Sequence, residues 1–215
     1  FLEPSSGIGS LLGLMPDMMA NNTDAVAIEL EPITGALVEQ LYPSADVYVK
    51  GFEAVPIPAG TIDFAATNVP FHKTGPADAE TRYGRPMNLH NYFIARILDS
   101  LRPGGIAAVI STHFTMDASP EDRALLSSKA DLIGAIRLPN TAFKANAGTE
   151  VTTDIMFFRK PDGSPFKGES WVNLASVGTY KTTKPGKSAK AKPIEVEENI
   201  TVNEYFKTHP EMVLG

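Results

Sequence analysis

Cysteine is absent from the 215 residues, and its absence excludes several chemistries at once. A chain without cysteine has no disulfide bond, no thiolate nucleophile and no cysteine-ligated zinc site. The histidines also show no ligand-like spacing such as H-x-x-x-H; they are His72, His90, His113 and His209. We therefore expect no metal centre. A cysteine-free composition is compatible with a cytoplasmic location, which we expect for this chain.

Long apolar runs are missing as well, because Asp, Asn, Gly or Pro interrupts every apolar stretch. None approaches the length of a membrane span, so we expect no membrane contact. The start of the chain has no basic segment before an apolar stretch, which argues against a signal peptide. The chain opens with Phe1-Leu2-Glu3 rather than methionine, so we expect the natural protein to extend upstream.

Basic residues are fewer than acidic ones, so the formal net charge is -6. Contacts to phosphates need Lys and Arg, and such contacts supply most non-specific affinity for nucleic acid. If DNA is the substrate, we expect further domains of the natural protein to supply much of the affinity.

Short apolar runs alternate with helical patterns over the first two thirds of the chain, which is typical of a parallel sheet covered by helices. We expect strands at Ala25–Leu30, Val47–Val49, Ile62–Thr67, Ile106–Ser111, Leu132–Leu138 and Asp154–Arg159, and helices at Ser10–Met19, Pro32–Leu41 and Leu89–Leu101. The last two strands have no helical pattern between them, which predicts an antiparallel hairpin. The predicted fold is a doubly wound α/β sheet of about seven strands, mostly parallel, with an antiparallel edge strand.

The composition changes after Lys160. The stretch Gly178–Lys192 has almost no large apolar residue, so we expect a solvated, flexible segment there. Its lysines are Lys181, Lys184, Lys187, Lys190 and Lys192. A short amphipathic segment, Val202–Phe206, follows it. We therefore divide the chain into a core at 1–160 and a C-terminal appendage at 161–215 that contains the flexible segment 178–192.

A glycine turn lies at the start of the chain, in Leu2-Glu3-Pro4-Ser5-Ser6-Gly7-Ile8-Gly9-Ser10. Gly7 and Gly9 allow a tight turn and a close approach of the backbone to a ligand. A lone G-x-G is weak, and a turn without a ligand is the alternative. The acidic Glu29 at the end of the next strand, about 20 residues later, favours the ligand, because a carboxylate there accepts hydrogen bonds from ribose hydroxyls. The combination predicts a nucleoside-containing cofactor.

The form of the turn narrows the choice of cofactor. It lacks the third glycine of dinucleotide-binding turns, and no G-x-x-x-x-G-K-[ST] sequence occurs in the chain. S-adenosylmethionine contains a nucleoside but no phosphate, so it fits the shorter turn better than NAD.

The sequence Thr67-Asn68-Val69-Pro70-Phe71 follows an apolar strand, at the edge of the sheet where open α/β folds bind ligands. The order of glycine turn, acidic strand end and Asn-x-Pro-Phe resembles the amino-methyltransferases of DNA, whose signature is Asn-Pro-Pro followed by Tyr or Phe. More narrowly, the chain resembles methylase segments fused to helicases in phage and mobile-element proteins. The similarity covers most of residues 1–160 through Leu2–Pro16, Asn88–Thr112 and Leu132–Lys160, and it extends to the tail Asn203–Gly215.

The resemblance implies a Rossmann-like methyltransferase that transfers a methyl group from S-adenosylmethionine to the exocyclic amine of adenine in DNA. That amine is a poor nucleophile because its lone pair is delocalised into the ring. Two acceptors, the Asn68 side-chain oxygen and the Val69 carbonyl, would localise the lone pair, while Phe71 stacks on a base flipped out of the duplex. Asn68, Val69, Pro70 and Phe71 are therefore the predicted catalytic residues. A cytosine C5 methylase would instead need a cysteine.

Further roles follow from the same resemblance. Phe52 would pack on the cofactor adenine, Glu53 would accept from its amine, and Glu3 would meet the amino group of the methionine part. With Gly7, Gly9, Glu29 and Asn68, they make up the predicted cofactor site. The loop residues His72, Lys73, Arg82 and Arg85 either close over DNA or lie on the surface, and we favour the surface.

Val69 is a departure from the family, which has proline at this position. The carbonyl acceptor survives the change, but valine adds an N–H and relaxes the restraint on φ. We therefore expect Val69→Pro to be tolerated or to raise activity.

Two other functions stay open at this point. One is methylation of RNA or of a protein glutamine, whose planar amide nitrogen can use the same two acceptors. The other is a non-catalytic module in a helicase fusion, which the presence of Asn68 and Phe71 disfavours. Related enzymes also have a motif upstream of the glycine turn and a target-recognition domain, so we expect this chain to be one part of a larger restriction-modification or helicase–methylase protein.

Overall fold

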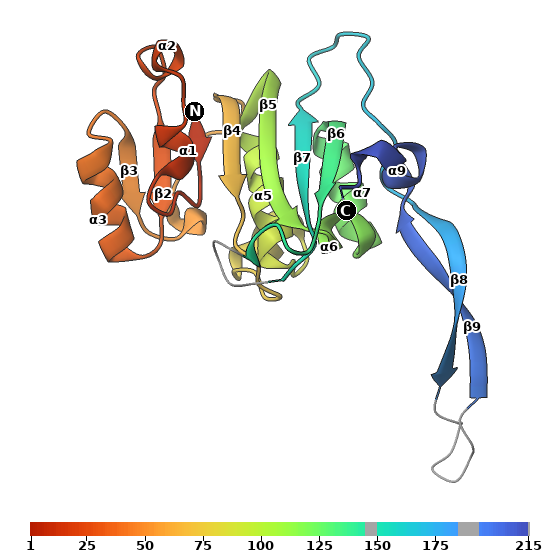
Figure 1. Cartoon of the computed structure of the whole chain (residues 1–215). Coiled ribbons are helices and arrows are strands. Elements are labelled where there is room, and N and C mark those ends of the chain that lie inside the picture. Colours follow the sequence, from red (N-terminus) through yellow and green to blue (C-terminus); the bar gives the residue numbers. More distant parts are fainter. Residues whose placement is uncertain (145–149, 185–193, 215) are drawn as a thin grey trace.

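The computed structural model describes residues 1–144, 150–184 and 194–214 (Figure 1). One sheet has seven strands in the order β3-β2-β1-β4-β5-β7-β6. Their bounds are β1 Leu2–Glu3, β2 Val26–Glu29, β3 Asp46–Val49, β4 Ile62–Asn68, β5 Leu101–Thr112, β6 Asp131–Leu138 and β7 Thr153–Arg159. Strands β1 to β5 pair in parallel, whereas β7 runs antiparallel to both β5 and β6. The prediction of a seven-stranded, mostly parallel sheet is confirmed.

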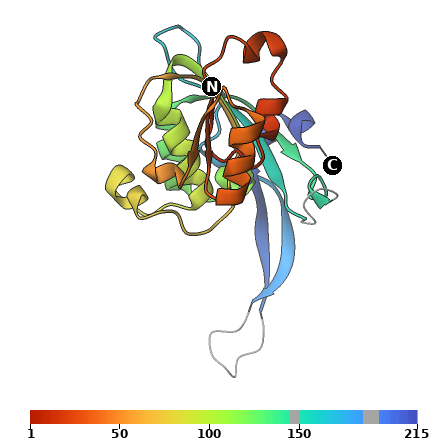
Figure 2. The same ribbon diagram turned by 90° about the vertical axis from the view of Figure 1, so that its left-hand side faces the viewer.

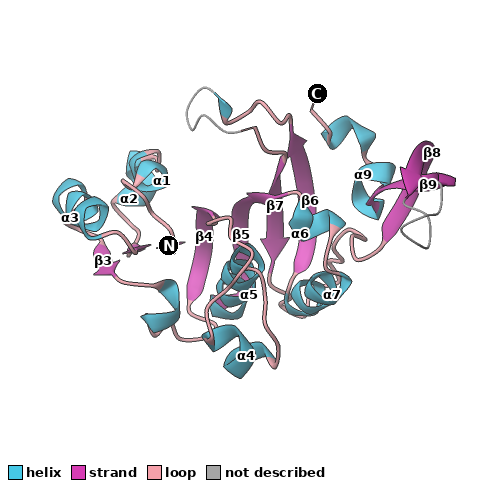
Figure 3. Ribbon diagram, turned by 90° about the horizontal axis from the view of Figure 1, so that it is seen from below, coloured by secondary structure: helices cyan, strands magenta, loops and turns pink. Residues whose placement is uncertain are grey.

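Helices cover both faces of this sheet. Figure 3 shows α1 to α3 on one face and α4, α5 and α7 on the other. The helices are α1 Ser10–Gly13, α2 Asp17–Ala20, α3 Pro32–Leu41, α4 Asp78–Tyr83, α5 Leu89–Ser100, α6 Phe114–Asp117, α7 Pro120–Lys129 and α9 Glu204–Thr208, with 3-10 turns η1 Phe52–Ala54 and η2 Pro210–Met212. The single helix predicted over Ser10–Met19 is wrong: the chain forms α1 and α2, since Pro16 provides no N–H to continue α1 and itself precedes the first turn of α2.

The core lies between α5 and the sheet. Nearly every side chain of α5 is buried, and Ile94, Ile97 and Leu98 have no exposed surface. They belong to one cluster with Val109 of β5 and Phe158 of β7. Burial of one such aliphatic side chain stabilises the fold by about 1.5–3 kcal/mol. This packing fixes α5 along the sheet, with its first residue, Leu89, beside Pro70 after β4 and its last residue, Ser100, bonded to Thr61 before β4.

Strands β8 (Leu174–Lys184) and β9 (Ile194–Asn203) form a separate two-stranded sheet that extends away from the main sheet (Figure 2). Within the segment 178–192 that was predicted to be flexible, Gly178–Lys184 belongs to β8 and pairs with β9; the flexibility of the segment stays a prediction. That prediction rested on the scarcity of large apolar residues, but Thr and Tyr favour strands, and the Thr179 hydroxyl donates to Glu197 across the pair at 2.6 Å. Lys187, Lys190 and Lys192 lie outside the described residues.

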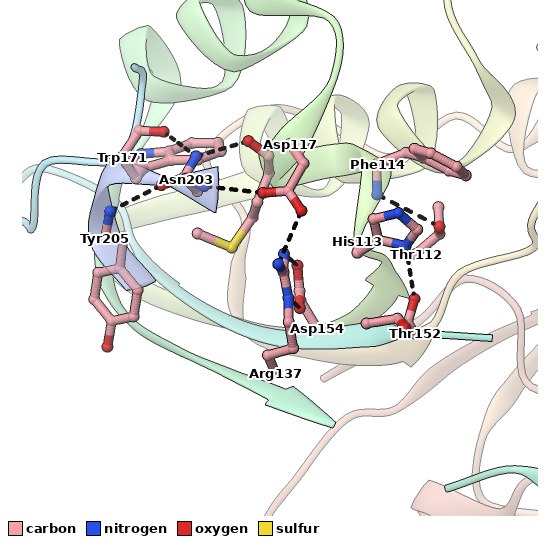
Figure 4. A network of polar contacts seen from close by, with 11 residues as sticks. Thr112, His113, Phe114, Asp117, Arg137, Thr152, Asp154, Trp171, Asn203 and Tyr205 are labelled. Atoms are coloured by element: carbon pink, nitrogen blue, oxygen red, sulfur yellow. Dashed lines mark hydrogen bonds and ion pairs between the residues drawn. The ribbon is translucent and has the colours of Figure 1, made fainter. Parts of the chain in front are cut away.

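Asn203, at the end of β9, joins that strand to helix α6, as Figure 4 shows. Its side-chain amide donates to the carbonyls of Met116 and Trp171, both at 2.7 Å, and its own N–H donates to Asp117 at 3.0 Å. Its side-chain oxygen caps α9 by accepting the Tyr205 N–H at 3.1 Å. The buried Trp171 and Tyr205 thus share the core of the preceding residues. A domain division at residue 160 stays a prediction.

Arg137 of β6 is the second link in this region (Figure 4). Its guanidinium makes two hydrogen bonds to the buried Asp154 of β7, at 2.8 and 2.9 Å, and an ion pair with Asp117 of α6 at 2.8 Å. Its planar group also lies 4.4 Å from the centre of the Phe206 ring. A largely buried cation, 12% exposed, contacts two carboxylates and an aromatic face and so holds α6, β6, β7 and α9 together.

Candidate functional site

The turn after β1 has a backbone conformation at Gly7 and Gly9 that glycine adopts readily. Gly7 and Gly9 have φ values of 53° and 78°, in the left-handed region that favours glycine. A Cβ at Gly9 would overlap the Tyr42 ring, whereas a Cβ at Gly7 would meet no atom within 4 Å. Gly7 therefore borders open space, where a ligand can approach the backbone.

Glu29 lies beside this turn at the end of β2. One carboxylate oxygen accepts the Gly7 N–H at 2.8 Å, and the other accepts the Glu31 N–H at 2.9 Å. A carboxylate has about four acceptor sites, so two remain for the hydroxyls of a ribose. Glu29 thus fixes the turn as well as lining the site, and the first of these roles was not predicted from the sequence.

A cavity of about 280 Å³ lies next to Glu29. It brings together four of the predicted site residues, since Phe52, Glu53 and Pro70 also line it. Leu89 and Phe93 of α5 complete an apolar wall that was not predicted. The volume lies just below the usual range for small-molecule sites.

Arg96 of α5 holds the η1 side of this cavity in place. Its guanidinium lies 4.2 Å from the centre of the Phe52 ring and donates to the carbonyls of Phe52 and Val55, the latter at 3.0 Å. Phe52 is buried and also packs on Phe93, with 5.1 Å between ring centres. Arg96 is a site residue that sequence reasoning missed, because nothing in the sequence links it to a turn 44 residues away.

Glu3 is buried at the end of β1, with 2% of its surface exposed. Among the described residues, its Oε2 has no hydrogen-bond partner. Burial raises the pKa of Glu3 to about 7, against the smaller opposing effect of backbone N–H groups of Leu12 and Leu11. A buried carboxylate with an unpaired oxygen beside the glycine turn suits a cationic group of a ligand, such as an ammonium.

Asn68 to Phe71 lie at the carboxyl end of β4, as predicted. Asn68 is exposed, and within the described part of the chain its side chain has no hydrogen-bond partner. Val69 is buried, and its N–H donates to the Ile110 carbonyl of β5 at 3.0 Å. Proline could not make this bond. Asn68 and Phe71, the latter 41% exposed, are thus open to solvent, while Pro70 between them lines the cavity.

The loop after Phe71 returns to α5 through two backbone hydrogen bonds. The Leu89 N–H donates to the His72 carbonyl at 3.0 Å, and the Gly75 N–H donates to the Met87 carbonyl at 2.9 Å. His72 and Lys73 are exposed, in line with the surface role favoured above. Arg82 pairs with Asp78 at 3.0 Å, and Arg85 pairs with the buried Asp122.

Among the residues that the structure describes, neither a membrane-spanning helix nor a metal-binding cluster occurs. None of their helices has both the length and the apolar composition needed to cross a membrane. Over these same residues, no group of three or more His, Asp or Glu side chains gathers in a way that could hold a metal ion.

Comparison of the sequence with known proteins gives one informative relative. The chain is 33% identical over 186 residues to defense against restriction protein B of Escherichia phage P1. The match covers 82% of this chain, which spans only 8% of the length of that protein. No protein-family model matches the chain.

Solved structures share the fold at low sequence identity. A class I S-adenosylmethionine-dependent methyltransferase from Listeria monocytogenes matches with a TM-score of 0.64 and 17% identity, over 78% of this chain and 55% of that one. A modification subunit of a type I restriction enzyme from Vibrio vulnificus matches with a TM-score of 0.59 and 17% identity, over 74% and 40% of the two chains. With its strand order and antiparallel β7, the chain has the fold of class I S-adenosylmethionine-dependent methyltransferases.

Proposed function

We propose that this chain transfers a methyl group from S-adenosylmethionine to the exocyclic amine of adenine in DNA. The observation that carries the proposal is the position of Asn68 to Phe71. The four residues leave the end of β4 directly beside the cavity that Glu29 and Phe52 line. A polar amide and an exposed aromatic ring next to this cavity suit the methylation of a planar base.

Four residues fit the proposed cofactor. Glu29 has acceptor sites left for the ribose hydroxyls, and the walls formed by Phe52 and Glu53 suit the adenine ring and its amine. The unpaired buried oxygen of Glu3 suits the ammonium of the methionine part. When bound, S-adenosylmethionine supplies a methyl group on a positively charged sulfur.

Asn68 and Val69 would act on the target amine. The Asn68 side-chain oxygen and the Val69 carbonyl accept hydrogen bonds from its two N–H groups, which localises the nitrogen lone pair for attack. The hydrogen bond from the Val69 N–H to Ile110 holds this peptide at a fixed position on β5. Phe71 stacks on the flipped base. Catalysis then depends on positioning, without a covalent intermediate on the protein.

The comparisons support DNA as the substrate class. The phage relative is named for defence against restriction, and the Vibrio vulnificus structure is a modification subunit of a restriction enzyme. The same Asn-x-Pro-Phe arrangement is compatible with RNA or protein glutamine, so the substrate must be tested directly.

The test is a transfer assay with the full natural protein and S-adenosylmethionine carrying a labelled methyl group. Duplex DNA, RNA and a glutamine-containing protein are supplied in parallel, and labelled nucleic acid is digested to nucleosides. We expect label in N6-methyladenine from DNA, and far slower labelling when Asn68→Ala replaces the wild type. Label confined to RNA or protein, or label absent everywhere while the cofactor binds, would overturn the proposal.

A further inference from the structure

A second cavity of about 650 Å³ lies on the loop that follows Phe71, between that loop and the start of α7. It is lined by Lys73 and Arg85 of the loop and by Ser119 and Asp122 at the start of α7. None of these residues lines the cofactor cavity. The cavity therefore offers binding space that the methyl donor does not use.

The two cavities are neighbours. Asn88 lines the second cavity, while the next residue, Leu89, lines the cofactor cavity. The hydrogen bond from the Leu89 N–H to the His72 carbonyl lies at this boundary, one residue beyond Phe71. A nucleic-acid strand whose base stacks on Phe71 would therefore continue toward the second cavity.

Arg85 is the cationic group best placed to meet such a strand. One of its terminal nitrogens donates to the buried Asp122, and its side chain is 32% exposed. A guanidinium has five N–H donors, and this bond uses one nitrogen. The remaining donors are available at the cavity wall, held in a fixed direction by a charge-assisted hydrogen bond.

Asp122 connects Arg85, through a series of hydrogen bonds, to the end of β5, to which Val69 is also bonded. The Asn91 amide of α5 donates to Asp122 at 2.6 Å, and its oxygen accepts from the Thr115 hydroxyl at 3.0 Å. The Thr115 and Ser111 hydroxyls are 2.8 Å apart. Ser111 follows Ile110, whose carbonyl accepts the Val69 N–H. Arg85 and Val69 are thus both fixed, through hydrogen bonds, to the end of β5.

The cavity lining holds two cations, Lys73 and Arg85, and two acids, Glu80 and Asp122, so its formal charges cancel and binding of an anion depends on which groups face the cavity. Asp122 is occupied by Arg85 and Asn91, so its charge is compensated. Glu80, the other acid of the lining, lies exposed on α4, where solvent screens it. The exposed Lys73 adds a second cation, and the Ser119 and Thr74 hydroxyls are neutral donors.

We infer that this cavity binds a backbone phosphate of the DNA strand next to the target adenine, that Arg85 is the phosphate contact and that Asp122 is its positioning residue. This inference rests on the proposed function. It gives the loop after Phe71 a role in holding the strand, in place of the plain surface role expected from the sequence.

A pair of double variants separates this role from a general effect of charge. Arg85→Gln with Asp122→Asn removes the ion pair without leaving a buried charge. Arg82→Gln with Asp78→Asn removes the matched pair on α4, which lies outside the cavity lining. We expect the first variant to raise KM for DNA roughly tenfold and to lower the salt slope of DNA binding by about 0.9, with kcat and cofactor affinity retained. The control should change neither.

Neutral methylphosphonate links, placed one at a time around the target adenine, identify the phosphate. Wild type should lose affinity at one flanking link, and the Arg85 variant should lose nothing further there. Equal losses in both proteins, or an unchanged salt slope while wild type methylates DNA, would overturn this inference alone. Failure of wild type to methylate any DNA would overturn the proposed function and this inference with it.

Discussion

The backbone N–H of Gly7 donates to the carboxylate of Glu29 at 2.8 Å, across 22 residues of sequence. This bond joins the turn after β1 to the end of the neighbouring strand β2. A hydrogen bond therefore connects the two elements predicted to bind the cofactor, and the Glu29 carboxylate shapes the turn while it keeps acceptor sites free.

Glu29→Ala should weaken the binding of S-adenosylmethionine by about 1.5–3 kcal/mol, because it removes hydrogen bonds to a charged acceptor. Isothermal titration calorimetry measures the change. Glu31→Gln is the matched control, since this exposed acid caps α3 through Thr34 and lies outside the cavity lining. Equal cofactor affinity in Glu29→Ala and wild type would show that the cavity has been assigned to the wrong ligand.

Glu3 should make stability fall as pH rises. Its folded pKa of about 7 lies above the ordinary value of 4.5, so the native state holds more protons than the unfolded state between these values. Stability from this group is complete below pH 4.5 and is lost as pH rises through 7, by about 3 kcal/mol.

Glu3→Gln should therefore gain stability over wild type as pH rises from 5 to 8, which urea unfolding at each pH measures. Glu31→Gln should show no trend over this range, because hydrogen bonds from Thr34 lower the pKa of Glu31, so this acid is ionised in both the native and the unfolded state above pH 5. A constant difference between Glu3→Gln and wild type would mean that Glu3 is charged throughout.

The sheet and much of the site follow from local sequence signals. Pro32 at the first position of α3 and the apolar spacing after it define Pro32–Leu41, and the structure has the same bounds. The start of α7 was missed although Pro120, Glu121 and Asp122 form an ordinary helix start. By contrast, Arg85 and Asp122 meet across 37 residues, and no local pattern encodes such a pairing.

Val69→Pro should destabilise the protein by about 1 kcal/mol, because proline cannot donate to the Ile110 carbonyl. This outcome reverses the tolerance expected from the sequence, where the hydrogen bond was not visible. Chemical denaturation measures the change. A variant as stable as wild type with faster methylation would favour the sequence-based expectation.

Asn203→Ala should cost about 3 kcal/mol of folding free energy, because it leaves the carbonyls of Met116 and Trp171 and the Tyr205 N–H without their partner. Asn199→Ala, an exposed position on the same strand, should change stability by less than about 0.5 kcal/mol. Similar losses from both substitutions would contradict the role of Asn203 in fixing the C-terminal residues.

The central claim is that Asn68 acts mainly on the target amine, although the resemblance also places it in the cofactor site. The most direct measurement is single-turnover methyl transfer to DNA by Asn68→Ala at saturating S-adenosylmethionine, with cofactor affinity measured on the same protein. We predict that the rate falls by roughly 10²–10³, as for loss of one group that stabilises a transition state, while cofactor affinity stays near that of wild type. Methylation at the wild-type rate would contradict the catalytic role of Asn68.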